Sequence, residues 1–311
     1  REIEGPEYYS SSFDNGVIAH EFAHGISTRL TGGPSNSGCL PSFDEDGDGT
    51  AETGEQMGEG WSDFFGLITT VYEGDQGSDR RGVGVYVNGE NENGRGIRAF
   101  PYSTDQSINP QTMNDLLSSS GVHATGAIWA AAIWDLYWAF VDLYGFDPDW
   151  RNTESGNFKA VQLVMDGMKF QPCAPGFMDG RDAILAADIA NYNGENQCMI
   201  WDVFANRGMG TDADQMSSLT QRDNVEGFEP LATCIKEIKI QKDIAGILTP
   251  GAESEVVLNF VNHIEETQQN VTIMDEIPAN SVFVSQNSTY DFEVVGNSII
   301  FEIGDLDYLE G

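Results

Sequence analysis

The pentapeptide His20-Glu21-Phe22-Ala23-His24 holds the residues of this sequence that are best suited to metal chemistry. On an α-helix, residues i and i+4 lie one turn apart on the same face, so both imidazoles can reach one metal ion. Glu21 is then expected beside the metal, where it can hydrogen-bond a water molecule. Imidazole and carboxylate donors in a four-coordinate site favour zinc. The pattern predicts a catalytic zinc site, and the alternative is a chance pair of surface histidines.

A third protein ligand is expected from Glu59. A catalytic zinc keeps one coordination position for water and therefore takes three protein ligands. Asp63 lies four residues further on the same face of a predicted helix, where it can accept the outer N–H of a ligating histidine and so select its tautomer. The alternative is that both are ordinary acids in a chain that contains 50 Asp and Glu residues.

An acidic stretch between these two halves of the predicted site has the spacing of a calcium-binding loop. With Asp44 as position 1, acids occupy positions 1, 3, 5, 9 and 12 and a glycine occupies position 6, as in an EF-hand loop. The expected calcium ligands are Asp44, Asp46, Asp48, Thr50 (through its backbone carbonyl) and Glu55. The Gly- and Pro-rich stretch before the loop does not predict the usual first helix. The alternative is a solvated acidic insertion.

The elements that must position these residues are mainly helical up to residue 233. Hydrophobic spacing with helix start and stop signals predicts helices over residues 15–30, 55–72, 122–144, 158–170, 179–192 and 199–206. From Cys234 onward, apolar and polar residues alternate over short stretches, at residues 235–244, 255–261, 270–273 and 298–303. We expect a mainly α-helical domain over residues 1–233 and a small all-β sandwich over residues 234–311, without an obvious final strand.

The net charge of −35 restricts the kinds of partner. It excludes nucleic acid, because phosphate binding needs clustered Lys and Arg, and it disfavours an anionic membrane surface. No stretch is expected to span a membrane, since the most apolar run, residues 127–144, is interrupted by Asp135 and Asp142. Such a charge suits a folded, highly soluble protein in salty or extracellular surroundings.

The four cysteines permit two disulfides in an oxidising compartment. None lies in a C-x-x-C pair, which argues against a thiolate metal site, and the spacing leaves the pairing open. The first residue is Arg1 rather than an initiator Met, so we interpret the chain as a processed or excised piece of a longer precursor.

Several segments together resemble the fungalysin family of metallopeptidases. They are residues 20–25, 29–33, 58–63, 97–104, 122–124, 171–173 and 205–208. The resemblance implies a thermolysin-like architecture and a secreted endopeptidase that acts on proteins or peptides and is held as a zymogen by an inhibitory propeptide. It also implies zinc ligands at His20, His24 and Glu59, with Glu21 as the general base.

Further roles follow from the same resemblance. It implies that His123 hydrogen-bonds the oxyanion of the intermediate, that Arg98 contacts a substrate carbonyl, and that Cys173 pairs with Cys198. Cys39 and Cys234 would form the remaining pair. The alternative for His123 is a structural role at the start of the helix that it opens, and the alternative for Arg98 is a surface ion pair.

The sequence departs from the family pattern in two places. Only 19 residues precede His20, where thermolysin-like enzymes have a β-rich subdomain, so that subdomain is expected to be largely absent from residues 1–233. The 35-residue step from His24 to Glu59 is longer than usual and contains no Tyr, so the tyrosine that assists the histidine in thermolysin has no match.

A second class of function is a non-catalytic adhesion or surface protein on a peptidase scaffold. The presence of Glu21 argues against it, because a binding scaffold needs no general base. The C-terminal stretch is similar to β-sandwich modules of bacterial surface proteins. We therefore expect secretion, with association at a cell surface, and a bacterial source.

Overall fold

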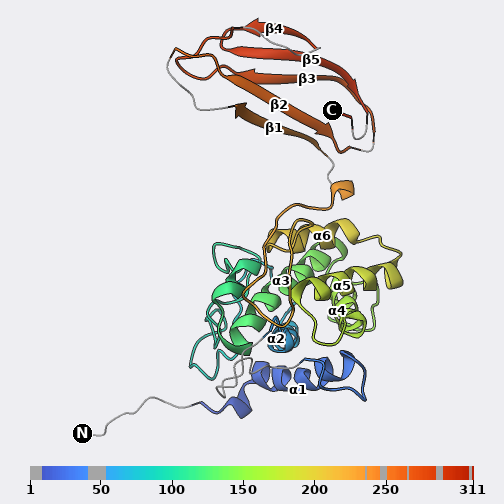
Figure 1. The fold of residues 1–311 in the computed structure, drawn as a ribbon. Helices are drawn as coiled ribbons and strands as arrows, with labels where there is room; N and C mark the ends of the chain where they lie inside the picture. Colours follow the sequence, from blue (N-terminus) through green and yellow to red (C-terminus); the bar gives the residue numbers. More distant parts are fainter. Residues whose placement is uncertain are drawn as a thin grey trace, which may run out of the picture. The chain divides into compact units, whose positions relative to one another are not determined.

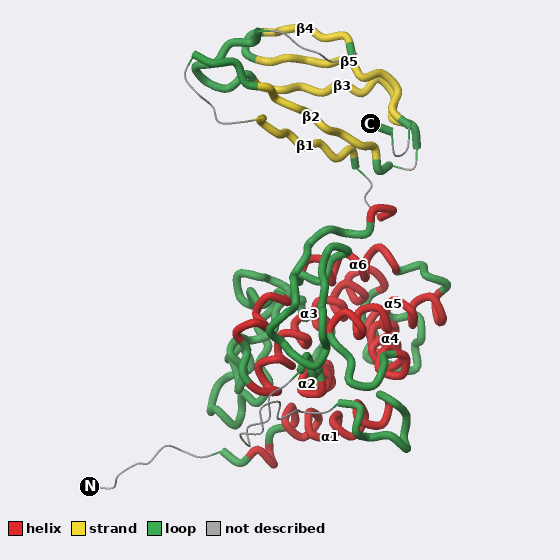
Figure 2. The backbone as a smooth tube through the Cα atoms, in the orientation of Figure 1, coloured by secondary structure: helices red, strands yellow, loops and turns green. Residues whose placement is uncertain are grey.

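The computed structural model describes residues 9–40, 54–234, 237–245, 251–264, 266–284, 290–307 and 310–311 of the 311-residue chain. The chain divides into two compact units, Arg1–Pro230 and Leu231–Gly311. The first is helical and the second is built from strands, as the ribbon and the tube show (Figures 1 and 2). At this level the expected fold class, a helical part followed by a small β part, is confirmed.

Six α-helices form the described part of the first unit (Figure 1). They are α1 (Asn15–Leu30), α2 (Gly58–Ile68), α3 (Gly121–Tyr144), α4 (Gly156–Phe170), α5 (Phe177–Tyr192) and α6 (Gln197–Asn206). Short 3-10 helices lie at Ser11–Phe13, Met113–Ser118 and, in the second unit, Ala232–Cys234.

Two helix boundaries show what local signals can and cannot predict. Helix α1 begins at Asn15 as expected, and Asp14 caps it, because its Oδ1 accepts the N–H of Val17 at 3.1 Å. The second helix, expected from residue 55, begins only at Gly58. Before it, the N–H of Glu55 donates to the carbonyl of Ser218 at 3.0 Å, and the Glu55 side chain accepts the N–H of Phe177 at 2.9 Å. The chain before Gly58 is thus bonded to distant segments, which no local signal predicts.

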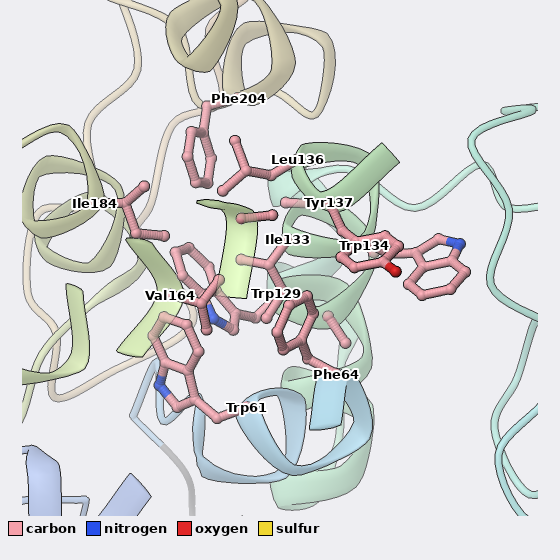
Figure 3. Packing of buried hydrophobic residues seen from close by; sticks show 14 of the residues in the cluster. Trp61, Phe64, Trp129, Ile133, Trp134, Leu136, Tyr137, Val164, Ile184 and Phe204 are labelled. Carbon is pink, nitrogen blue, oxygen red and sulfur yellow. The ribbon is translucent and has the colours of Figure 1, made fainter. Parts of the chain in front are cut away.

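The core of the first unit surrounds α3 (Figure 3). The buried residues of α3 include Trp129 and Ile133, which pack against Trp61 and Phe64 of α2. Helices α4, α5 and α6 supply the side chains Val164, Ile184 and Phe204. Because a helix of this kind is apolar nearly all round, it requires burial on most of its surface.

By length and composition, α3 is the one helix in the described ranges that could cross a membrane. However, 83% of its most apolar window is buried inside the protein, as in the core helix of a soluble protein. Asp135, which interrupts its apolar run, accepts hydrogen bonds from the guanidinium of Arg207 at 2.6 and 3.1 Å. This pairing satisfies the acid within the protein.

Helices α2 and α3 approach each other closely at two glycines. A Cβ on Gly60 would lie 2.3 Å from the carbonyl oxygen of Gly126, and one on Gly126 would lie 2.5 Å from the Cβ of Glu59. Both contacts involve atoms that cannot move without moving a helix. The distance between these helices, and with it the position of Glu59, therefore depends on the absence of two side chains.

The Cys39–Cys173 disulfide corrects both expected pairings, the one that the resemblance implied and the one that remained. The segment that follows α1 folds back along the segment before α5, because the Gln171 side chain donates to Thr31 Oγ1 at 2.8 Å and the Ala174 N–H donates to the Cys39 carbonyl at 2.9 Å. Pairing of Cys173 with Cys198 and of Cys39 with Cys234 is therefore wrong. All four cysteines lie in described ranges, and none is free.

The described part of the second unit contains five antiparallel strands in two small sheets (Figure 2). They are β1 (Ile238–Ala245), β2 (Glu255–Asn262), β3 (Gln268–Glu276), β4 (Asp291–Val295) and β5 (Ser298–Leu306). One sheet pairs β1 with β2, and the other has the order β3-β5-β4. Strand β4 was not expected from the sequence, although residues 291–294 of its Asp-Phe-Glu-Val-Val run alternate polar and apolar. It pairs with β5 across a two-residue turn, and every residue in it is exposed.

Alanine at Gly126 should destabilise the fold by about 1–3 kcal/mol, the usual cost of overpacking. The added methyl group would press on the backbone and side chain of Glu59. Thermal unfolding should show a clearly lower Tm. The control is Gly25→Ala in α1, because the added Cβ would meet only the flexible end of Arg29. Alanine has a higher helix propensity than glycine, so Tm should be unchanged or higher. Equal Tm values for the two variants would contradict this account of the α2–α3 contact.

Candidate metal centre

Helices α1 and α2 bring two imidazoles and one carboxylate together. One donor atom each from His20, His24 and Glu59 lies within 4.8 Å of the others. His20 Nε2 is 3.1 Å from Glu59 Oε2, and His24 Nε2 is 3.5 Å from Glu59 Oε1. Two ligands of a tetrahedral zinc with ordinary bond lengths are roughly 3.3 Å apart. The donor set and its spacing therefore fit a single zinc ion.

Asp63 orients His20 from the side opposite Glu59. Its Oδ1 lies 2.8 Å from His20 Nδ1, and its side chain is completely buried. A proton on Nδ1 leaves the lone pair of Nε2 available to a metal. Burial lowers the pKa of His20, but hydrogen bonds to Asp63 and Glu59 outweigh it and raise the pKa to about 9. A proton on His20 thus balances the two acids until a metal takes its place.

Arg98 binds both carboxylates of the centre. Its Nε and Nη2 donate to the two oxygens of Asp63 at 2.7 and 2.8 Å, and Nη2 also donates to Glu59 Oε2 at 3.2 Å. Burial raises the pKa of Asp63, but the hydrogen bonds from His20 and Arg98 hold it below its ordinary value. Arg98 itself is only 6% exposed, so it does not form the surface ion pair that was its alternative.

Tyr102 is a member of this network that the residue patterns did not single out. Its hydroxyl donates to Asp63 Oδ2, and its ring is buried. The segment 97–104 carries part of the family resemblance, but nothing in its spacing indicates that this hydroxyl turns toward Asp63. The contact arises because the Arg81 and Tyr102 backbones pair with each other, which fixes the path of the segment.

His123 and Glu21 are the more exposed residues of the site. His123 lies in the first turn of α3, with Nε2 3.4 Å from Glu59 Oε2 and 66% of its side chain exposed. Glu21 follows His20 on α1 and is also exposed. Of the site residues expected from the sequence, Glu21 and His123 thus remain exposed to solvent.

The protonation of the remaining donors also suits a metal. Burial is the main reason that the pKa of His24 lies below its ordinary value, which favours the neutral imidazole. Burial raises the pKa of Glu59, but the hydrogen bond from His20 and the nearby charges of His123, His20 and His24 hold it below its ordinary value. Glu59 is therefore a carboxylate.

Of the predicted calcium ligands, Asp44, Asp46, Asp48 and Thr50 lie outside the described residues. Glu55 is described, and its side chain is completely buried. Its Oε2 accepts the N–H of Phe177 at 2.9 Å, while its Oε1 has no hydrogen-bond partner in the described ranges. Burial raises the pKa of Glu55 to about 8, and the nearby acids Asp223, Asp179 and Asp214 also raise it.

Residues 5–213 match the fungalysin metallopeptidase family, M36. The chain belongs to this family. Among the curated relatives of this fungalysin chain is the extracellular metalloproteinase MEP of Fusarium vanettenii, 44% identical over 216 residues, which are 67% of this chain and 32% of the relative. The corresponding Aspergillus fumigatus protein is 42% identical over 220 residues, covering 69% and 33%. That of Pyricularia oryzae is 43% identical over 216 residues, covering 67% and 32%.

The chain spans about a third of the length of these curated relatives. The relatives named here are fungal, so they do not support the bacterial source that was expected. Their names give no support to a non-catalytic surface protein either. The family assignment agrees with the resemblance read from the sequence.

Asparagine at Asp63 should destabilise the fungalysin chain by about 3–5 kcal/mol, because Arg98 would then lack its fully buried partner. Zinc affinity should also fall by roughly 10–100-fold through the loss of His20 orientation. Chemical denaturation and zinc titration measure the two effects. Asparagine at the exposed Asp149, which pairs with Arg151, should change stability by less than about 1 kcal/mol. An Asp63→Asn variant with wild-type stability and wild-type zinc affinity would contradict the network described above.

Proposed function

We propose that this fungalysin chain carries the catalytic centre of a secreted zinc endopeptidase. One observation carries the proposal: donor atoms of His20, His24 and Glu59 converge within 4.8 Å, directly beside Glu21. The names of the relatives, extracellular metalloproteinases, support metal-dependent proteolysis outside the cell. Because the chain spans about a third of those relatives, the activity, the peptide substrates and the propeptide of the whole protein belong to the proposal.

His20, His24 and Glu59 would hold the zinc ion, and Asp63 would keep His20 in the tautomer that binds it. A bound zinc lowers the pKa of a water molecule and polarises the scissile carbonyl. The short contacts of both imidazoles with Glu59 support this assignment. Arg98 then has two roles: it holds Glu59 and Asp63 by the hydrogen bonds given above, and it is the candidate contact to a substrate carbonyl.

Glu21 is the proposed general base. Its place directly after His20 in the H-E-x-x-H pattern and its exposure support this role. It takes a proton from the attacking water and passes this proton to the departing amine. His123 donates a hydrogen bond to the oxyanion that develops on the carbonyl oxygen, where a preorganised donor has most effect.

The proposal also includes the larger arrangement. A thermolysin-like helical subdomain would extend over residues 1–233, with residues 234–311 as a β-sandwich accessory domain. Two packed helices that supply a histidine pair and a glutamate support the first part, and the antiparallel strands of the second unit support the second. Secretion is supported by the cysteine pairing, since disulfides persist in oxidising compartments.

Glutamine at Glu21 should abolish casein cleavage, with a fall in kcat of about 10²–10⁴-fold, because the carboxylate base is lost. Zinc content, measured by metal analysis of the same sample, should stay at the wild-type level because Glu21 is not a ligand. Glutamine at Glu195, an exposed acid between α5 and α6, is the matched control and should leave both unchanged. A Glu21→Gln protein as active as the wild type would refute the mechanism.

We also propose that calcium binds residues 44–55, through Asp44, Asp46, Asp48, Thr50 and Glu55, and stabilises the segment that leads to Glu59. The sequence spacing supports this. So does Glu55, because a fully buried carboxylate with one unpartnered oxygen in the described ranges is costly unless a proton or a cation compensates it.

Selective removal of calcium should lower both Tm and activity. A ligand that binds only the folded state stabilises it by about 2.7 kcal/mol at a hundredfold excess over Kd. The protein is dialysed into calcium-free buffer with free zinc held constant, and calcium is then returned. Recovery of Tm and activity on its return supports the proposal. The same Tm and activity with and without calcium would contradict the proposed calcium site.

A further inference from the structure

We propose that Gln221 is a positioning residue for His123, which it holds near Glu59 by fixing the first turn of α3. The inference rests on the proposed role of His123 as a hydrogen-bond donor to the oxyanion. Gln221 lies beyond residues 5–213, the part of the chain that the family match covers.

The first turn of α3 needs support from outside the helix. Its N-cap residue, Ser120, makes no side-chain capping hydrogen bond, and Gly121 has φ +76°. The first N–H groups of a helix have no partner within it, so an uncapped first turn opens easily. His123 lies in this turn with 66% of its side chain exposed, so packing of its own ring does little to hold it.

The amide of Gln221 supplies that support on both sides of His123. Its Oε1 accepts the hydroxyl of Thr125 at 3.0 Å, and its Nε2 donates to the carbonyl of Ser119. The hydroxyls of Ser119 and Thr125 lie 3.1 Å apart and complete a closed ring of contacts. Gln221 is only 8% exposed, so these bonds are shielded from water. One side chain thus joins the residues that precede and follow the histidine.

The segment that carries Gln221 is itself fixed. Asn224 Nδ2 donates to the Gln221 carbonyl at 2.9 Å, and the backbones of Asp214 and Val225 exchange hydrogen bonds of 2.8 and 2.7 Å. The amide of Gln221 therefore starts from an anchored backbone rather than from a loose loop.

The same segment also touches the approach to α2. The N–H of Glu55 donates to the carbonyl of Ser218 at 3.0 Å, three residues before α2 begins and four before Glu59. Residues 217–224 thus contact both the chain that leads to Glu59 and the turn that holds His123. The two residues that these contacts flank, His123 and Glu59, have their Nε2 and Oε2 atoms 3.4 Å apart.

The substitution Gln221→Met keeps a similar side-chain volume and removes both side-chain hydrogen bonds of Gln221. In the zinc-loaded full chain, kcat should fall about tenfold with KM nearly unchanged, as expected when a donor to the transition state is misplaced rather than lost. Methionine at Gln197 is the control, because that amide bonds Leu185 and Asp188 between α5 and α6, and kcat should be unchanged. The substitution Thr125→Val removes the hydrogen bond to Gln221 with little change of shape. It replaces Gln221→Met in the experiment if that variant does not fold.

Two further readouts separate positioning from general stability. In a His123→Ala background, Gln221→Met should cause no additional loss of kcat. Hydrogen exchange of the amides at residues 125–127, which donate to the carbonyls of the first turn of α3, should be faster in Gln221→Met and unchanged in Gln197→Met. An equal loss of kcat in both backgrounds, or unchanged exchange, would overturn the proposal. If His123→Ala keeps full activity, the proposed role of His123 is wrong, and so is the positioning role of Gln221. If His123→Ala loses activity but Gln221→Met keeps it, the proposed function stands and only the positioning role of Gln221 is wrong.

Discussion

The carboxylate of Asp63, completely buried, is the group on which the candidate metal centre depends. It accepts hydrogen bonds from Arg98 and Tyr102 and lies 2.8 Å from His20, so one acid connects α1, α2 and the chain around residue 100. A buried charge without a partner costs several kcal/mol. The positions of these partners are therefore required by the stability of the fold as well as by a metal.

The packing of the helices explains how this network meets its neighbours at the right distance. Helix α2 lies against α3 at Gly60 and Gly126, where no side chain separates the backbones. Glu59 is next to this contact, and its carboxylate lies close to the imidazoles of His20, His24 and His123. The buried half of the centre is thus built on rigid packing, whereas the exposed half depends on the start of α3, which has no cap of its own.

Much of the site could be predicted from the sequence because its spacing is local. His20 and His24 are one helical turn apart, as are Glu59 and Asp63, so a helix brings each pair onto one face whatever the rest of the chain does. The meeting of the two pairs, and of His123 with Glu59, followed from resemblance rather than from spacing. Tyr102 and Gln221 were not foreseen, because their roles depend on hydrogen bonds across 39 and 96 residues.

Three features of the fold were not predicted from the sequence. The disulfide joins Cys39 to Cys173 because the segment after α1 folds back on the segment before α5, and no local pattern encodes that path. Before the second helix, Glu55 is bonded to Ser218 and Phe177, which lie far away in the sequence. Strand β4 instead forms by pairing with its neighbour β5 across a two-residue turn. The first two features therefore depend on contacts between distant segments, whereas β4 is a local hairpin that the sequence analysis missed.

Anomalous diffraction at the zinc absorption edge, from crystals of the zinc-loaded protein, tests the central claim most directly. The account predicts one strong anomalous peak within bonding distance of His20 Nε2, His24 Nε2 and a Glu59 oxygen, with Asp63 still bound to His20 Nδ1. A zinc peak at other residues, or no peak between these three side chains in a protein that binds zinc, would contradict it.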